Sequence, residues 1–142
     1  MEFDLRSLKM KKRILVLCTG NSARSQIAEG LFRAKAGDFL DVYSAGTNPK
    51  QLNPLAVEVM NEIGIDISGH FSKDVAQFDG QKFDLVLTVC DNARESCPVF
   101  PGAKTIHWNI QDPEGVESFR KVRDELTQRI DEFLRQDLSK LP

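Results

Sequence analysis

The chemistry of this sequence is concentrated in three cysteines, Cys18, Cys90 and Cys97. A thiolate can act as a nucleophile, and a pair of thiols can deliver two electrons by forming a disulfide. An odd cysteine count is a poor basis for a structural disulfide framework, and the charged N-terminus has no signal-peptide pattern. We therefore expect a reducing, cytoplasmic compartment, in which thiols are reactive or inert rather than bridged.

Cys18 opens a loop in which five residues separate it from Arg24. A loop that leads into a helix directs backbone N–H groups inward, where they and the helix dipole attract an oxyanion and favour a thiolate. Gly20 and Asn21 tolerate the left-handed backbone that such a loop needs. The fork of Arg24 can bind two oxygens, and Ser25 can donate a hydrogen bond to the thiolate. The expected anion-binding residues are Thr19, Gly20, Asn21, Ser22, Ala23, Arg24 and Ser25. The alternative is a cysteine that only packs at the end of a strand.

The elements that must position this loop alternate between strand and helix patterns. Short apolar runs predict strands at residues 13–17, 41–46, 83–89 and 104–108. Apolar residues at helical spacing predict helices at residues 25–36, 54–63 and 117–135. The pattern predicts an α/β fold: a small three-layer domain with a four-stranded parallel sheet flanked by helices. By analogy with small doubly wound domains we expect the strand order 2-1-3-4, with ligands beyond the carboxyl ends of the strands. Cys18, Cys90 and residues 108–112 should then share one rim.

Residues 18–30 resemble the active-site loop of the low-molecular-weight protein tyrosine phosphatase superfamily. More narrowly, they resemble the loop of the thioredoxin-coupled arsenate reductases built on that fold. The resemblance covers nearly everything from Lys12 to the last helix, with further matching motifs at residues 43–46, 87–90, 97–98, 107–108 and 112–113.

This resemblance implies an arsenate reductase that works by a relay of three cysteines. Cys18 would attack arsenate, Cys90 would attack the adduct and release arsenite, and Cys97 would resolve the Cys18–Cys90 disulfide. Thioredoxin, or another small dithiol reductant, would then reduce the Cys90–Cys97 redox disulfide. The polar segment 91–96 would loop out during the relay. Asp112 would be the general acid that protonates the leaving oxygen, whereas an Asp before a proline is otherwise common in turns.

One departure from the family concerns a cation site. Some members bind potassium through residues that match Asn21, Glu29 and Ser44, together with a carboxylate at the position of Lys73. The ammonium of Lys73 could occupy the place of the cation beside Glu29, which predicts no potassium dependence. A one-residue slip that brings Asp74 into this position is the alternative.

Two further departures concern the substrate and the relay. Ala23 stands where many superfamily members carry a second cysteine, so Cys90 is left as the resolving thiol. Glu114 and Gly115 replace the aromatic residues that shape a phosphotyrosine pocket, which favours a small inorganic substrate.

Other functions stay open at this point. One is a phosphatase of the same fold that acts through a Cys18 phosphoenzyme, with Cys90 and Cys97 incidental. Another is a domain that senses anions or metals. Zinc is disfavoured because the spacing from Cys90 to Cys97 is too long for a zinc knuckle and only two histidines, His70 and His107, are available. We expect no metal and no cofactor.

Composition sets the remaining expectations. The 142 residues, with 19 Lys+Arg and 21 Asp+Glu, suit a single catalytic domain over residues 12–142 after an N-terminal extension over residues 1–11. A formal charge of −2 gives no sign of nucleic-acid binding. No apolar run approaches the roughly 20 residues that a membrane span needs. We expect a monomer.

Overall fold

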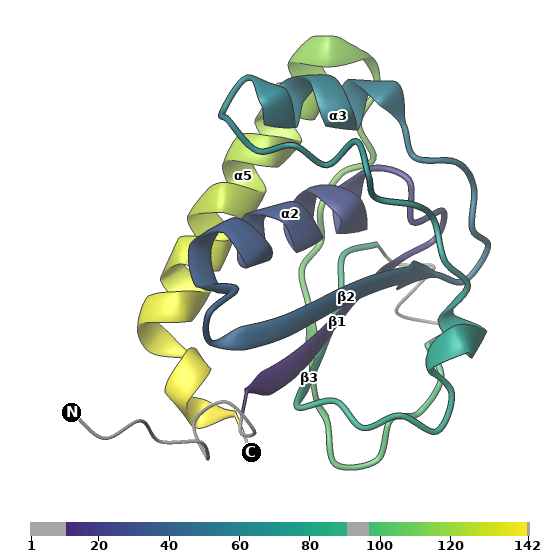
Figure 1. The fold of residues 1–142 in the computed structure, drawn as a ribbon, viewed down its shortest axis with the longest axis vertical. Helices are drawn as coiled ribbons and strands as arrows, with labels where there is room; N and C mark the ends of the chain where they lie inside the picture. The colour runs from purple at the N-terminus through teal and green to yellow at the C-terminus, as the bar shows by residue number, and fades with distance from the viewer. Residues whose placement is uncertain (1–10, 91–96, 142) are drawn as a thin grey trace.

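Four parallel strands form the centre of the molecule in a computed structural model that describes residues 11–90 and 97–141 (Figure 1). The strands are β1 (Lys12–Cys18), β2 (Leu40–Gly46), β3 (Leu85–Thr88) and β4 (Lys104–His107). Their order in the sheet is β2-β1-β3-β4, which confirms the predicted order 2-1-3-4. The expected looping segment 91–96 and nearly all of the expected N-terminal extension lie outside the described residues.

Three α-helices accompany the sheet within the described residues: α2 (Arg24–Ala36), α3 (Pro54–Asn61) and α5 (Gly115–Gln136). The predicted start of α3 is confirmed, because the side chain of Asn53 accepts a hydrogen bond from Leu55 N at 2.8 Å and Pro54 opens the helix. Helix α5 buries the predicted apolar stripe, which includes Phe119, Val122, Leu126, Ile130 and Phe133. Over the described part of the chain, none of the helices is long and apolar enough to cross a bilayer.

The three helices gather on one face of the sheet, as Figure 1 shows. Side chains alternate between the two faces of a strand. Because Ser44 of β2 reaches Glu29 of α2, its neighbour Tyr43 points to the opposite face. There its ring packs at 5.7 Å from that of Phe78 and 6.0 Å from that of Phe83. Aromatic residues and short segments therefore form the third layer.

Two short 3₁₀ helices were not predicted from the sequence, η1 (Val75–Phe78) and η2 (Leu138–Lys140). Helix η1 lies in the third layer, where Val75 and Phe78 are buried. Asp74 caps it, since its side chain accepts from Ala76 N at 2.9 Å. A helix of four residues gives no periodic pattern that sequence analysis could recognise.

The carboxyl ends of the strands place two cysteines at one rim. Strand β1 ends at Cys18, and Val89 N donates to Leu17 O at 2.9 Å, which continues the pairing of β1 with β3 beyond Thr88. Cys90 therefore lies at the same edge of the sheet as the loop that follows β1. This confirms the prediction that Cys18 and Cys90 share one rim of the sheet.

Candidate active site

The loop between β1 and α2 has all its carbonyl groups engaged on its outer side. The oxygens of residues 18, 19, 20 and 22 accept hydrogen bonds of 2.8–3.2 Å from the backbone N–H groups of Thr47, Asn48, Lys50 and Asn53, respectively. The oxygen of Asn21 accepts from Gln26 Nε2 at 3.0 Å and Ser72 Oγ at 2.7 Å, and the oxygen of Ala23 accepts from Ile27 N at 2.9 Å in the first turn of α2. No peptide bond of the described residues is cis, and a trans peptide unit directs its N–H opposite to its C=O. The N–H groups of residues 19–23 therefore face inward and form a cradle for an oxyanion.

Asn21 adopts the left-handed backbone predicted for this loop, with φ 47°. Gly20, which would also tolerate this backbone, is not among the residues with positive φ. The turn at Asn21 brings its own N–H to 3.2 Å from Cys18 Sγ, so the backbone stabilises negative charge on that sulfur.

Cys18 is buried at the base of the cradle, 2.9 Å from Ser25 Oγ. Ser25 Oγ also accepts a hydrogen bond of 2.7 Å from Asn21 Nδ2. Because a hydroxyl carries a single hydrogen, that of Ser25 is available to the sulfur. The predicted donation from Ser25 to a Cys18 thiolate is therefore geometrically in place.

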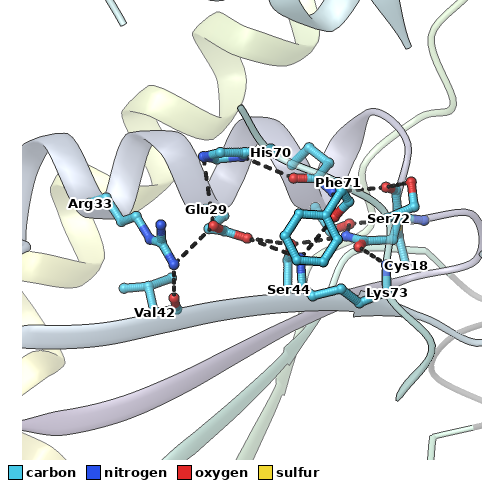
Figure 2. Close-up of polar contacts among 12 residues, drawn as sticks. Cys18, Glu29, Arg33, Val42, Ser44, His70, Phe71, Ser72 and Lys73 are labelled. Atoms are coloured by element: carbon cyan, nitrogen blue, oxygen red, sulfur yellow. Dashed lines mark hydrogen bonds and ion pairs between the residues drawn. The ribbon is translucent and has the colours of Figure 1, made fainter. Parts of the chain in front are cut away.

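A buried polar network extends from this thiol to Glu29 (Figure 2). Asn21 Nδ2 also donates to Ser44 Oγ at 2.9 Å, and Ser44 Oγ donates to Glu29 Oε1 at 2.5 Å. The Oδ1 of Asn21 accepts from Lys73 N at 2.9 Å, which fixes the orientation of the amide. Every polar atom along this path has a partner, so the path holds Asn21 in one conformation.

Three basic side chains surround the carboxylate of Glu29. Arg33 lies at 3.1 Å, His70 at 3.7 Å and Lys73 at 3.9 Å from its oxygens. Lys73 thus stands beside Glu29, as the sequence predicted. Asp74, the alternative for this position, is engaged at the cap of η1. Within residues 11–90 and 97–141, no group of three or more His, Cys, Asp or Glu side chains could hold a metal ion.

Burial changes the titration of two of these bases. Burial lowers the pKa of His70 below its usual 6.5, and the attraction of Glu29 only partly opposes this. Burial likewise lowers the pKa of Lys73, again against the attraction of Glu29. Gln26 donates its amide N–H groups to Asn21 O and Phe71 O, so its Oε1 is the acceptor in the 3.0 Å hydrogen bond from His70 Nδ1. The histidine therefore supports the anion loop through Gln26.

A cavity of about 410 Å³ opens above the cradle. Its walls include six residues of the predicted site loop: Cys18, Thr19, Gly20, Ser22, Ala23 and Arg24. Asn21 and Ser25 are fully buried behind these residues. Arg24 donates to Ile110 O at 3.0 Å, and its other terminal nitrogen lies 3.6 Å from Asp112 Oδ1. Asp112 lines the same cavity, so the predicted acid faces the predicted anion site.

The other two cysteines differ in their surroundings. Cys90 is buried with its Sγ 3.2 Å from Thr19 Oγ1, so it lies directly beside the anion loop. Cys97 is half-buried, its Sγ donates to Pro98 O at 3.3 Å, and burial raises the pKa of its thiol. All three cysteines of the chain are among the described residues, and none forms a disulfide.

Gly46 supports the site in a way that sequence reasoning missed. A Cβ at this position would lie 2.5 Å from Thr19 O and 2.9 Å from Asn21 N. Only glycine therefore lets the end of β2 approach the back of the anion loop. A glycine at the end of a strand is a general sign of such close approach and could have indicated it. Gln26 and Ser72, which bind Asn21 O, carried no comparable signal.

Sequence comparison places this geometry in a family. The family profile described as low molecular weight phosphotyrosine protein phosphatase matches residues 13–141. The chain belongs to this family. Its relatives include an arsenate reductase of Halalkalibacterium halodurans, which is 48% identical over 132 residues, with 87% of this chain and 95% of the relative covered.

Solved structures of the family contain both activities. A thioredoxin-dependent arsenate reductase of Corynebacterium glutamicum is 30% identical and superposes with a TM-score of 0.74, over 87% of this chain and 60% of that one. A low molecular weight protein tyrosine phosphatase of T. tengcongensis is 31% identical with a TM-score of 0.77, over 88% of this chain and 99% of that one. The fold is therefore shared by reductases and phosphatases, and the choice between them depends on individual residues.

Proposed function

We infer that this protein is an arsenate reductase. The identity of 48% to a curated arsenate reductase supports this assignment over most of the chain. The observation that carries it is the thiol of Cys90, whose Sγ lies 3.2 Å from Thr19 Oγ1 of the anion loop. A phosphatase needs only the nucleophile at the base of the cradle. Reduction of arsenic(V) also needs a second thiol near the nucleophile, and the position of Cys90 beside the anion loop supports that role.

The proposed relay begins with attack of the Cys18 thiolate on arsenate held by the cradle. An As–S bond forms and an oxygen leaves as water. Cys90 then attacks Cys18 Sγ, the S–As bond breaks, and its electron pair stays on arsenic, which leaves as arsenite. The two electrons come from the two thiols, which become the Cys18–Cys90 disulfide. Cys97 attacks Cys90 and releases the Cys18 thiolate, leaving a Cys90–Cys97 disulfide.

Other residues of the cavity have supporting roles in this proposal. The inward N–H groups of the loop would hold the oxygens of arsenate. Arg24 would turn its fork toward two of these oxygens and leave its present partners, Ile110 O and Asp112. Asp112 would donate the proton that the departing oxygen needs to leave as water.

The proposed reductant of the Cys90–Cys97 disulfide is thioredoxin. One solved neighbour is described as thioredoxin-dependent, which supports a small dithiol protein as the partner of this chain. Because the relay requires thiols that are reduced between turnovers, we propose the cytoplasm as its compartment. Residues 12–142 would act as one catalytic domain and as a monomer.

A phosphatase acting through a Cys18 phosphoenzyme is the second candidate. The similarity to a solved phosphatase, with a TM-score of 0.77, favours it because the two activities share the anion cradle. In that function Cys90 and Cys97 would have no task.

Arsenate turnover separates the two candidates. The assay couples the protein to thioredoxin, thioredoxin reductase and NADPH, and compares the wild type with Cys90→Ser and Cys97→Ser. Both variants should lose turnover by at least about 100-fold, because each lacks an obligatory sulfur. Calorimetric binding of inorganic phosphate checks that the anion loop remains folded. Turnover at the wild-type rate in both variants would exclude the relay.

A further inference from the structure

Lys50 is a residue of the cavity wall to which the relay assigns no task. It belongs to segment 47–53, which follows β2 and binds the outer side of the anion loop. Its backbone N–H donates to Gly20 O at 2.8 Å. Its Cγ and Cδ both lie 3.6 Å from the position that a Cβ on Gly20 would take. The side chain therefore runs along the anion loop, and the ammonium is only two bonds beyond Cδ.

The charge of Lys50 is available to a ligand. Across the described part of the chain, its ammonium makes no hydrogen bond or ion pair with the protein, whereas Arg24 in the same cavity is engaged with Ile110 O and Asp112. The backbone hydrogen bond from Lys50 N to Gly20 O holds Lys50 in this place without any contact of its ammonium. The protein thus presents a flexible cation at the mouth of the cradle.

A positive charge at this position would reduce the electrostatic repulsion that arsenate meets in the cavity. Arsenate carries one to two negative charges near neutral pH, and it must approach a Cys18 thiolate, which repels it. Arg24, whose Nη2 lies 3.6 Å from Asp112 Oδ1, offsets part of this repulsion. A second positive charge at the mouth opposes the remaining repulsion and concentrates anions there. Water screens an exposed ammonium, so its effect on affinity should be modest, about three- to tenfold.

We propose that Lys50 is a specificity-determining residue, whose ammonium binds the outward oxygens of a small inorganic dianion seated in the cradle. This inference rests on the proposed function for its substrate. Lys50 acts in capture of the anion and not in the sulfur chemistry, because the proposed relay assigns the nucleophile to Cys18 and the proton donation to Asp112. It distinguishes ligands by charge and therefore serves arsenate and phosphate alike.

The test compares Lys50→Gln and Lys50→Arg with a matched control, Lys104→Gln. Lys104 is an exposed lysine at the first residue of β4, at the end of the sheet opposite the cavity. Two quantities are measured at low and high salt: the calorimetric Kd for inorganic phosphate and the steady-state constants for arsenate. For Lys50→Gln, we expect the Kd and the KM to rise by the same factor, about three to ten, with kcat unchanged. Lys50→Arg and Lys104→Gln should match the wild type, and high salt should shrink the difference.

These measurements test the role of Lys50 separately from the proposed arsenate reductase function. An unchanged phosphate Kd in Lys50→Gln, or an equal loss in Lys104→Gln, overturns the role of Lys50 even if arsenate is reduced. A fall in kcat with an unchanged KM also overturns it. If phosphate binding depends on Lys50 but the wild type reduces no arsenate, the proposed function fails and the anion-binding role of Lys50 stands.

Discussion

Asn21 is the residue at which the nucleophile and its supports meet. Its backbone N–H contacts Cys18 Sγ, and its amide nitrogen donates to both Ser25 and Ser44. Its amide oxygen and its backbone oxygen are bound by Lys73 N and Ser72 Oγ. A left-handed residue whose four polar groups are all engaged cannot rotate without breaking several contacts. Asn21 therefore fixes the cradle in the shape that receives an oxyanion before any substrate arrives.

Replacement of Gly46 tests whether the shape of the cradle depends on its close contact with the end of β2. In Gly46→Ala, the new Cβ would fall 2.5 Å from Thr19 O, so the loop must shift away from β2. We expect kcat/KM for arsenate to fall at least about tenfold, because loop N–H groups displaced by a few tenths of an ångström hold the anion poorly. Gly69→Ala is the matched control, since a Cβ there meets nothing within 4 Å. Equal activity of the two variants would contradict this role for Gly46.

Some residues of the site could be predicted from the sequence and others could not. Cys18, Arg24 and Ser25 were found because a cysteine, an arginine and a helix start follow one another in a single short loop. Gly46 and Ser72 were missed because their contacts to that loop depend on how distant segments pack, and local sequence does not encode those distances.

At the scale of elements, the anion loop is held between two connecting segments. Segment 47–53 binds its carbonyl groups, and the segment before η1 contributes Ser72 and Lys73. The sequence predicted the helices and strands on either side of these segments, because periodic apolar residues and the Asn53-Pro54 cap carry clear signals. It did not predict the segments' contacts or η1, because irregular backbone has no periodicity.

The segment that carries Lys73 leads to a prediction about cations. The ammonium of Lys73 lies 3.9 Å from Glu29 Oε1 and donates to Phe71 O at 2.9 Å, so the carboxylate already has a positive neighbour. We therefore expect the same melting temperature and the same arsenate turnover in potassium as in sodium chloride at equal ionic strength. A strong rise of either quantity in potassium alone would show that a cation site exists beside Glu29.

For the whole molecule, α5 is the element that joins the cavity to the rest of the helical layer. Its residue Phe119 lines the cavity, and its residues Arg120 and Arg123 bind Glu62 at the end of α3. Arg120 Nη2 lies 2.7 Å and Arg123 Nη1 2.8 Å from the Glu62 carboxylate. Because α3 directly follows segment 47–53, the cluster of Glu62, Arg120 and Arg123 also restrains the segment that binds the outer side of the anion loop.

Acid should weaken this cluster in a definite range of pH. Hydrogen bonds from Arg120, and then from Arg123, lower the pKa of Glu62 from 4.5 to about 2. A lowered carboxyl pKa means that the contribution to stability is complete above pH 4.5 and is lost as the pH falls toward 2. Glu62→Gln should therefore lower the melting temperature by a few degrees at neutral pH, and less as the pH falls through this range.

Thermal melts between pH 7 and pH 2 measure this effect against Glu58→Gln. Glu58 lies on the same helix, is exposed, and has no ion pair among the described residues. The control should melt like the wild type throughout. A constant difference between Glu62→Gln and the wild type at every pH would show that the cluster stabilises the protein by packing rather than by charge.

In the proposed relay, reduction of arsenate first produces a Cys18–Cys90 disulfide, which Cys97 then converts into a Cys90–Cys97 disulfide. The most direct test of this relay is to add arsenate, without thioredoxin, to Cys97→Ser and to map the disulfides by mass spectrometry. Without its terminal thiol the relay should stop at a Cys18–Cys90 disulfide, formed together with an equivalent amount of arsenite. Arsenite released without this disulfide, or thiols that all stay reduced while the wild type turns over, would contradict the account.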